Sequence, residues 1–286
     1  MIELGNSPEI LRSQYPDGVI MYHQGYKELA NTVLSQFAKQ LPGYLPIIKG
    51  FDSQYLFAED WVTDRGGQIG NILYGDISFY DCLLDGISSQ TGIKRQEIEP
   101  LLPPMIYEER IGRNVAINGY NVPIGGTSLV FQGITDPFTT EIYNQQDIRL
   151  LPLDSLRQAI HEDKQQSAGG GIQLLSAHID LAITGFRTGD HLSIYLDEKY
   201  GYLGEEIIRI LADNNAILET IPHDLAKKGA LNIRYIDNKA VIPSCKVLGP
   251  IASRLIAHDY ELVELGEDQM LDGGGVKCRM IPISWR

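Results

Sequence analysis

Three stretches of the chain carry apolar residues at the spacing of an amphipathic helix, three and four positions apart. They are residues 25–40, 204–214 and 246–257. This spacing gathers the apolar side chains on one face of a helix, which can then pack on a sheet. Pro250 lies inside the third stretch and has no amide N–H, so we expect it to reset the start of that helix.

Short apolar runs alternate with the helical stretches and predict strands. In the last part of the chain they are residues 231–236, 239–243, 260–265 and 278–283. Asp237-Asn238, between the first two runs, suits a tight hairpin turn. With the helix at 246–257, the predicted order is strand, strand, helix, strand.

An earlier part of the chain predicts the same order. HIDLAITGF at residues 178–186 predicts a strand, residues 187–190 a turn, and HLSIYL at residues 191–196 a second strand, with a helix following at Glu205. No linker rich in proline, serine or charge divides the chain. We therefore predict one α/β domain over residues 1–286, assembled from repeated small units.

The composition is that of a globular protein with an acidic surface. Of its 286 residues, 43% are hydrophobic and 21% are charged, and the formal net charge is -13. A uniformly acidic protein repels nucleic acid and anionic membranes and attracts cationic ligands. We expect neither nucleic acid nor a membrane as a partner.

Cysteine usage and the N-terminal sequence indicate a soluble cytoplasmic protein. Cys82, Cys245 and Cys278 are far apart and odd in number, and no CxxC pair or cysteine–histidine cluster predicts a metal site. The N-terminus lacks the basic and apolar segments of a signal peptide. No apolar run approaches the roughly 20 residues of a membrane span.

A glycine run near the C-terminus precedes a candidate nucleophile. In MLDGGGVKC, residues 270–278, three glycines come before Cys278, which opens the last predicted strand. Backbone without side chains lets a substrate approach closely and leaves N–H groups free to polarise it. A thiol needs a partner to ionise at neutral pH. The alternative is a small buried hydrophobic residue beside a loop.

Two other segments carry the side chains that such a nucleophile needs. In AHIDLAI, His178 and Asp180 would point to one face of a strand, as a proton-transfer group beside an anchor for a cation. A polar, solvent-facing strand is the alternative. LFAEDWVTDRGG contains Asp60 and Asp64, and taken alone it is simply an acidic loop.

Together these segments resemble the guanidino-group-modifying, or pentein, superfamily of deiminases, dimethylarginine hydrolases and amidinotransferases. In the C-terminal half the resemblance rests on AHIDLAI, DNKAVIPS and DGGGVKC, in that order. In the first half it rests on Phe57 to Asp60 before a glycine turn, and on IGGTSLV at residues 124–130. The fold that it implies is a five-bladed α/β propeller of ββαβ units.

The resemblance also implies a covalent mechanism. Cys278 would attack the guanidinium carbon, and His178 would act first as general acid and then as general base. Asp180 and an upstream aspartate would hold the planar guanidinium by paired hydrogen bonds. Asp60 is favoured over Asp64 as that aspartate, because it leaves a short strand before the glycine turn.

Water would then resolve the amidino-thioether on Cys278, which makes the protein a hydrolase of the deiminase or dihydrolase type. Gly274 and Gly275 would lie against the substrate, a small cationic guanidino compound that is either free or peptide-bound. The resemblance implies neither a metal nor an organic cofactor. A homo-oligomer is compatible with this interpretation.

Two positions depart from the pattern of the superfamily. Several relatives carry Glu-Gly-Gly where this chain has Ile124-Gly125-Gly126, so a carboxylate is missing. Lys277 stands where relatives often have histidine, and alternation along a strand would point it away from the sulfur. The missing carboxylate supports a non-catalytic guanidine-binding protein as one alternative. A second alternative is an amidinotransferase, in which an amine replaces water as the acceptor.

Overall fold

The computed structural model describes residues 7–23, 30–49, 68–69, 72–75, 77–107, 121–124, 127–131, 148–151, 181–211, 215–266 and 275–286. The chain divides into two compact units. One comprises Met1–Asn114 and Arg279–Arg286, and the other Val115–Cys278. The single domain expected over residues 1–286 stays a prediction.

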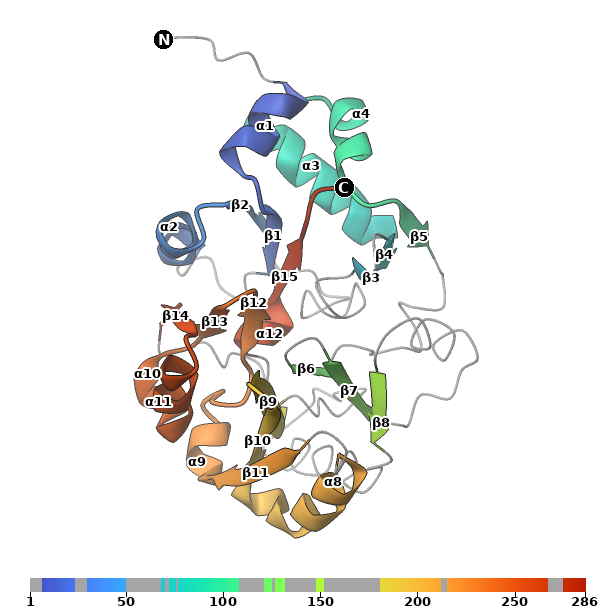
Figure 1. The fold of residues 1–286 in the computed structure, drawn as a ribbon. Coiled ribbons are helices and arrows are strands. Elements are labelled where there is room, and N and C mark those ends of the chain that lie inside the picture. The colour runs from blue at the N-terminus through green and yellow to red at the C-terminus, as the bar shows by residue number, and fades with distance from the viewer. Residues whose placement is uncertain are drawn as a thin grey trace, which may run out of the picture. The chain divides into compact units, whose positions relative to one another are not determined.

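One arrangement of three strands recurs along the chain (Figure 1). The described strands form five sheets of three strands each, and the middle strand of every sheet is antiparallel to one neighbour and parallel to the other. Parallel neighbours require a crossover connection, and helices occupy the four crossovers that fall largely within the described residues. The predicted α/β class is therefore confirmed.

The first sheet joins the two ends of the chain. Its elements are α1 (Pro8–Gln14), β1 (Gly18–His23), α2 (Ala30–Gln40), β2 (Tyr44–Lys49) and β15 (Met280–Ile283). Strand β1 lies in the middle, parallel to β2 and antiparallel to the C-terminal β15. The helix predicted over residues 25–40 is confirmed from Ala30 onward, and residues 25–29 lie outside the described ranges.

The second sheet belongs to the same unit. Its elements are β3 (Gln68–Ile69), β4 (Ile72–Gly75), α3 (Ile77–Thr91), α4 (Arg95–Ile98), η2 (Glu99–Leu101) and β5 (Met105–Tyr107). Helix α3 buries Leu83, Leu84 and Ile87 on one face, at helical spacing. These side chains share a hydrophobic core with Val19 of β1 and Ile283 of β15, so one core connects both sheets of this unit.

The third and fourth sheets belong to the second unit. The third contains β6 (Asn121–Ile124), β7 (Thr127–Phe131) and β8 (Ile148–Leu151). The fourth contains β9 (Ile183–Thr188), β10 (His191–Asp197), η5 (Glu198–Leu203), α8 (Gly204–Ile210) and β11 (Ala216–Ile221). The predicted strand, strand, helix, strand order of the fourth sheet is confirmed, with Gly189 in its hairpin turn at a φ of 59°.

The fifth sheet confirms the same predicted order. Its elements are β12 (Arg234–Ile236), β13 (Lys239–Ile242), α10 (Cys245–Leu248), α11 (Pro250–Ala257) and β14 (Glu261–Glu264), and α9 (His223–Ala226) precedes them. Asp237 turns the hairpin at a φ of 51°, and Pro250 starts a new helix as predicted. Phe186 of β9 and Leu255 of α11 lie in one core that joins the fourth and fifth sheets.

Several predicted elements are shorter in the structure. Within the described residues, the strand predicted over residues 178–186 begins at Ile183. The helix predicted over residues 204–214 ends at Ile210, and the strand predicted over residues 231–236 begins only at Arg234. The last strand begins at Met280 instead of Cys278, because a helical turn, α12 (Val276–Arg279), precedes it. No helix in the described part of the chain is both long and apolar enough to cross a membrane.

Candidate active site around Cys278

Cys278 lies on α12, the four-residue helix directly before β15. Its side chain is fully buried, with a relative exposure of 0%, and so is that of Val276. The prediction that the sulfur lies at the start of a strand is therefore wrong. Strand alternation consequently does not apply to Lys277, which is itself buried, at 2% exposure.

Asn232 binds this helical turn through both ends of its side-chain amide. Its Nδ2 donates a hydrogen bond to Sγ of Cys278 at 3.2 Å. Its Oδ1 accepts hydrogen bonds from the backbone N–H groups of Lys277, at 2.8 Å, and Cys278, at 3.3 Å. The side chain is 0% exposed, so these bonds form away from bulk water. One amide therefore fixes both the backbone of the turn and the surroundings of the sulfur.

Gly275 accounts for part of the glycine run. A Cβ at this position would lie 2.6 Å from Oδ1 of Asn232 and 2.9 Å from its Cβ and Cγ. Any side chain at residue 275 would therefore displace the amide that holds Cys278. Here the missing side chain makes room for a group of the protein itself, and contact between Gly275 and a substrate stays a prediction.

Three buried basic residues accompany the turn: Lys277 and Arg279 are part of α12, and Arg234 binds its backbone. Nη2 of Arg234 donates a hydrogen bond to the backbone carbonyl of Lys277 at 2.8 Å. The Arg234 side chain is 4% exposed, and its Nε has no hydrogen-bond partner among the described residues.

This geometry suits an oriented sulfur nucleophile. The sulfur accepts a hydrogen bond from a neutral amide, and such a donor stabilises a thiolate more than a thiol. The N–H groups of Lys277 and Cys278 donate to Asn232, so they are not free to polarise a substrate. The expectation of free N–H groups in the glycine run concerns the preceding residues and stays a prediction.

The remaining predicted site residues lie outside the described ranges. They are Asp60, Asp64, His178, Asp180 and Gly274. The described chain resumes at Leu181, immediately after Asp180. The carbonyl of Ala182 accepts a hydrogen bond from the N–H of Asp197 at 2.9 Å. The segment that follows the predicted histidine and aspartate is thereby attached to the end of β10.

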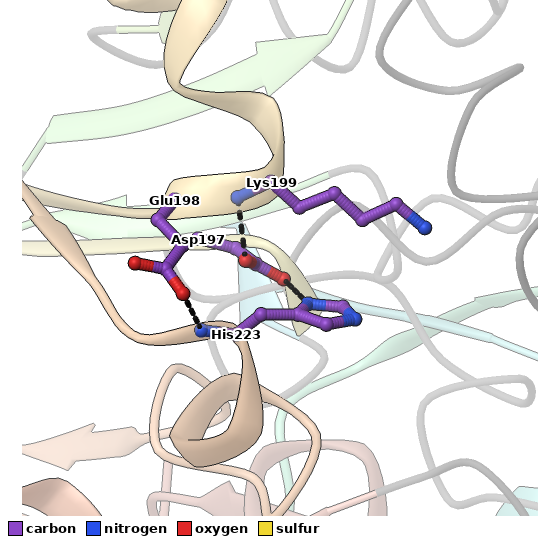
Figure 2. Close-up of polar contacts among 4 residues, drawn as sticks. All are labelled: Asp197, Glu198, Lys199 and His223. Carbon is purple, nitrogen blue, oxygen red and sulfur yellow. Dashed lines mark hydrogen bonds and ion pairs between the residues drawn. The ribbon is translucent and has the colours of Figure 1, made fainter.

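Asp197 also organises a polar cluster at that end of the sheet (Figure 2). Its Oδ2 lies 2.7 Å from Nδ1 of His223, and its Oδ1 accepts a hydrogen bond from the N–H of Lys199 at 3.0 Å. Glu198 accepts a hydrogen bond from the backbone N–H of His223 at 2.9 Å. Because the Asp197 side chain is 4% exposed, these contacts bind the end of β10 firmly to the start of α9.

The position of the missing carboxylate lies at a hairpin. Ile124 is the last residue of β6 and pairs with Thr127, the first residue of β7.

No group of three or more histidine, cysteine, aspartate or glutamate residues within the described ranges could hold a metal ion.

Solved structures define the class of fold to which this chain is similar. No protein-family model matches the sequence, and no curated protein matches it. The structure nonetheless resembles arginine dihydrolase, dimethylarginine dimethylaminohydrolase and agmatine deiminase, members of the pentein superfamily. The likeness that the sequence motifs indicated is thus confirmed, and at these identities it concerns the fold.

Three relatives illustrate the match. The substrate-bound N-terminal domain of ArgZ, an arginine dihydrolase from the ornithine–ammonia cycle in Cyanobacteria, matches with a TM-score of 0.55 and 9% identity, over 93% of this chain and 97% of that one. The citrulline complex of DDAH from Pseudomonas aeruginosa matches with a TM-score of 0.52 and 12% identity, over 93% of this chain and 98% of that one. Agmatine deiminase from C. jejuni matches with a TM-score of 0.50 and 13% identity, over 94% of this chain and 93% of that one. Whole ArgZ is longer, and this chain spans 39% of its length.

Sequence reasoning missed Asn232 and Arg234. Both lie in LNIRYI, an apolar run read as a strand, in which an asparagine and an arginine occupy positions two apart. Polar residues inside an otherwise buried run were the available signal, because a buried polar side chain must find a partner.

Proposed function

We propose that this protein is a cysteine-dependent hydrolase of guanidino groups, with Cys278 as its nucleophile. The observation that carries the proposal is a buried cysteine whose sulfur accepts a hydrogen bond from Asn232, in a fold like that of arginine dihydrolase and agmatine deiminase. The five sheets of equal topology support a five-bladed α/β propeller as its architecture.

The proposed reaction has two steps. The Cys278 thiolate attacks the guanidinium carbon, one C–N bond breaks, and His178 gives a proton to the departing ammonia or alkylamine. The amidino group then remains on sulfur as a thioether. A water molecule loses a proton to His178 and attacks the same carbon, and the C–S bond breaks. The products are a ureido compound and the free thiolate.

The carboxylates are proposed to bind the substrate cation. Asp180 and Asp60, with Asp64 as the alternative to Asp60, would each accept hydrogen bonds from the guanidinium N–H groups. The net charge of -13 supports attraction of a cationic substrate. Ile124 leaves one carboxylate fewer than several relatives have, so we expect substrate preference to differ from theirs.

The test is product detection by mass spectrometry over a panel of guanidino compounds. The panel contains arginine, agmatine, methylated arginines and arginine peptides, each with and without glycine or ornithine as acceptor. Cys278→Ser is the inactive variant, because a serine hydroxyl is a far weaker nucleophile than a thiolate. Cys245→Ser is the matched control, since Cys245 hydrogen-bonds Glu264 and has no proposed role in the reaction.

The products decide the reaction type. A ureido product with release of ammonia identifies a deiminase, and release of an alkylamine identifies cleavage of a methylated arginine. We expect hydrolysis, because the three relatives compared above are a dihydrolase, a dimethylaminohydrolase and a deiminase. Product formed only with an acceptor amine would replace the proposal by amidino transfer. Full activity of Cys278→Ser would overturn the assignment of the nucleophile.

A further inference from the structure

We infer that Asn232 is a positioning residue that sets the ionisation and direction of the Cys278 thiol. The inference rests on the proposed function insofar as Cys278 is a nucleophile. Three contacts of Asn232, which no sequence motif indicated, support the inference. Its side chain donates one hydrogen bond to the sulfur and accepts two from backbone N–H groups of α12.

The orientation of the amide follows from its surroundings. The two backbone N–H groups can only donate, so the atom that faces them must be the amide oxygen. The other end of the amide is then an NH₂ group, which donates to Sγ of Cys278. Gly275 lies against the same amide, so closely that a Cβ at residue 275 would lie 2.6 Å from Oδ1 of Asn232.

A donor aimed at sulfur acts differently on the two protonation states. A thiolate is a much stronger acceptor than a thiol, and hydrogen bonds to ionised groups are about twice as strong as neutral ones. The Asn232 amide is buried and held by two further bonds, so it need not reorganise when the proton leaves. It therefore favours the thiolate, and it engages one lone pair of the sulfur, which fixes the direction of that lone pair.

The variant that isolates this role is Asn232→Asp. Its carboxylate still accepts the N–H groups of Lys277 and Cys278, but it presents an acceptor instead of a donor to the sulfur. The readout is thiolate absorbance at 240 nm as a function of pH, taken as the difference from the Cys278→Ser variant of the same background. We expect the midpoint to move upward by roughly one to two pH units.

Asn238→Asp is the matched control. It makes the same chemical change in the exposed hairpin turn after β12, six residues further along, and should leave the midpoint where the wild type has it. Steady-state kinetics with a substrate identified by the panel above provide a second readout. With that substrate, Asn232→Asp should lower kcat at neutral pH at least tenfold, while KM changes less.

A measurement on the wild type avoids dependence on a variant that fails to fold. With selective asparagine labelling, the Nδ2 proton resonance of Asn232 should move downfield as Cys278 ionises, and should stay constant in Cys278→Ser. A midpoint unchanged in folded Asn232→Asp, or an Nδ2 resonance that ignores the thiol titration, overturns the inference. Neither readout requires turnover, so both stand even if no guanidino compound is a substrate.

Discussion

Replacing Gly275 by alanine tests the tightest contact of the site. The new Cβ would lie 2.6 Å from Oδ1 of Asn232, well inside van der Waals contact. Asn232 is fully buried and held by three hydrogen bonds, so relief requires it to give up some or all of them. Each bond contributes about 1 kcal/mol net, and overpacking typically costs about 1–3 kcal/mol.

A loss of about 3 kcal/mol is therefore expected for Gly275→Ala, which corresponds to a decrease of roughly 6–12 °C in Tm. Differential scanning fluorimetry measures this directly. The matched control is Gly201→Ala, whose Cβ would lie 3.7 Å from Cγ2 of Thr220, an ordinary contact. We expect that control to melt at or slightly above the wild-type temperature. Equal Tm values for the two variants would refute the argument that residue 275 must be glycine to accommodate Asn232.

The other predictions concern the second unit. Asp197→Ala should lower Tm, because it removes a buried acceptor at a cost of about 1–3 kcal/mol. The control Glu205→Ala changes an exposed position and should leave Tm unchanged. Equal effects of the two substitutions would show that the polar cluster of Figure 2 contributes nothing to stability. Burial, aided by the negative charge of Glu219, raises the pKa of Tyr195 to about 12 from the ordinary 10.0. The unfolded chain then loses this proton first, so the stabilisation is complete below pH 10 and is lost between pH 10 and about 12. Melting temperatures from pH 9 to 11.5 should fall less steeply in Tyr195→Phe than in the wild type, and parallel curves would contradict the cause.

The order of elements in the fourth and fifth sheets was predictable from apolar spacing and turn residues. Apolar runs mark their strands and helices, and the hairpin of each sheet has its own turn signal. Asp237 takes the φ of 51° that its hairpin requires, and Pro250 restarts a helix since it has no N–H to donate. The hairpin turn and the helix start depend on interactions between near neighbours in sequence. The local pattern of residue types is therefore enough to predict them.

The site was less predictable, because its contacts join residues far apart in sequence. Cys278 and Asn232 are 46 residues apart, and nothing in either segment indicates the other. The strand expected from Cys278 onward begins two residues later, because Cys278 and Arg279 belong to the helical turn α12. The side-chain oxygen of Asn232 accepts two backbone N–H groups there, so a side chain takes the role that a neighbouring strand would have. Apolar periodicity cannot detect such competition.

The resemblance to a superfamily and the structure supply different parts of the functional argument. The motifs predict roles for His178 and Asp180, and the structure describes the surroundings of Cys278, the proposed nucleophile. Cys278 is the last residue of the second unit, and the chain enters the other unit at Arg279. Asn232 and Arg234, which bind this turn by hydrogen bonds, both belong to the second unit. Substitutions just before β12 should therefore change the reactivity of the sulfur directly, whereas substitutions on β15 should first change the packing of the first sheet.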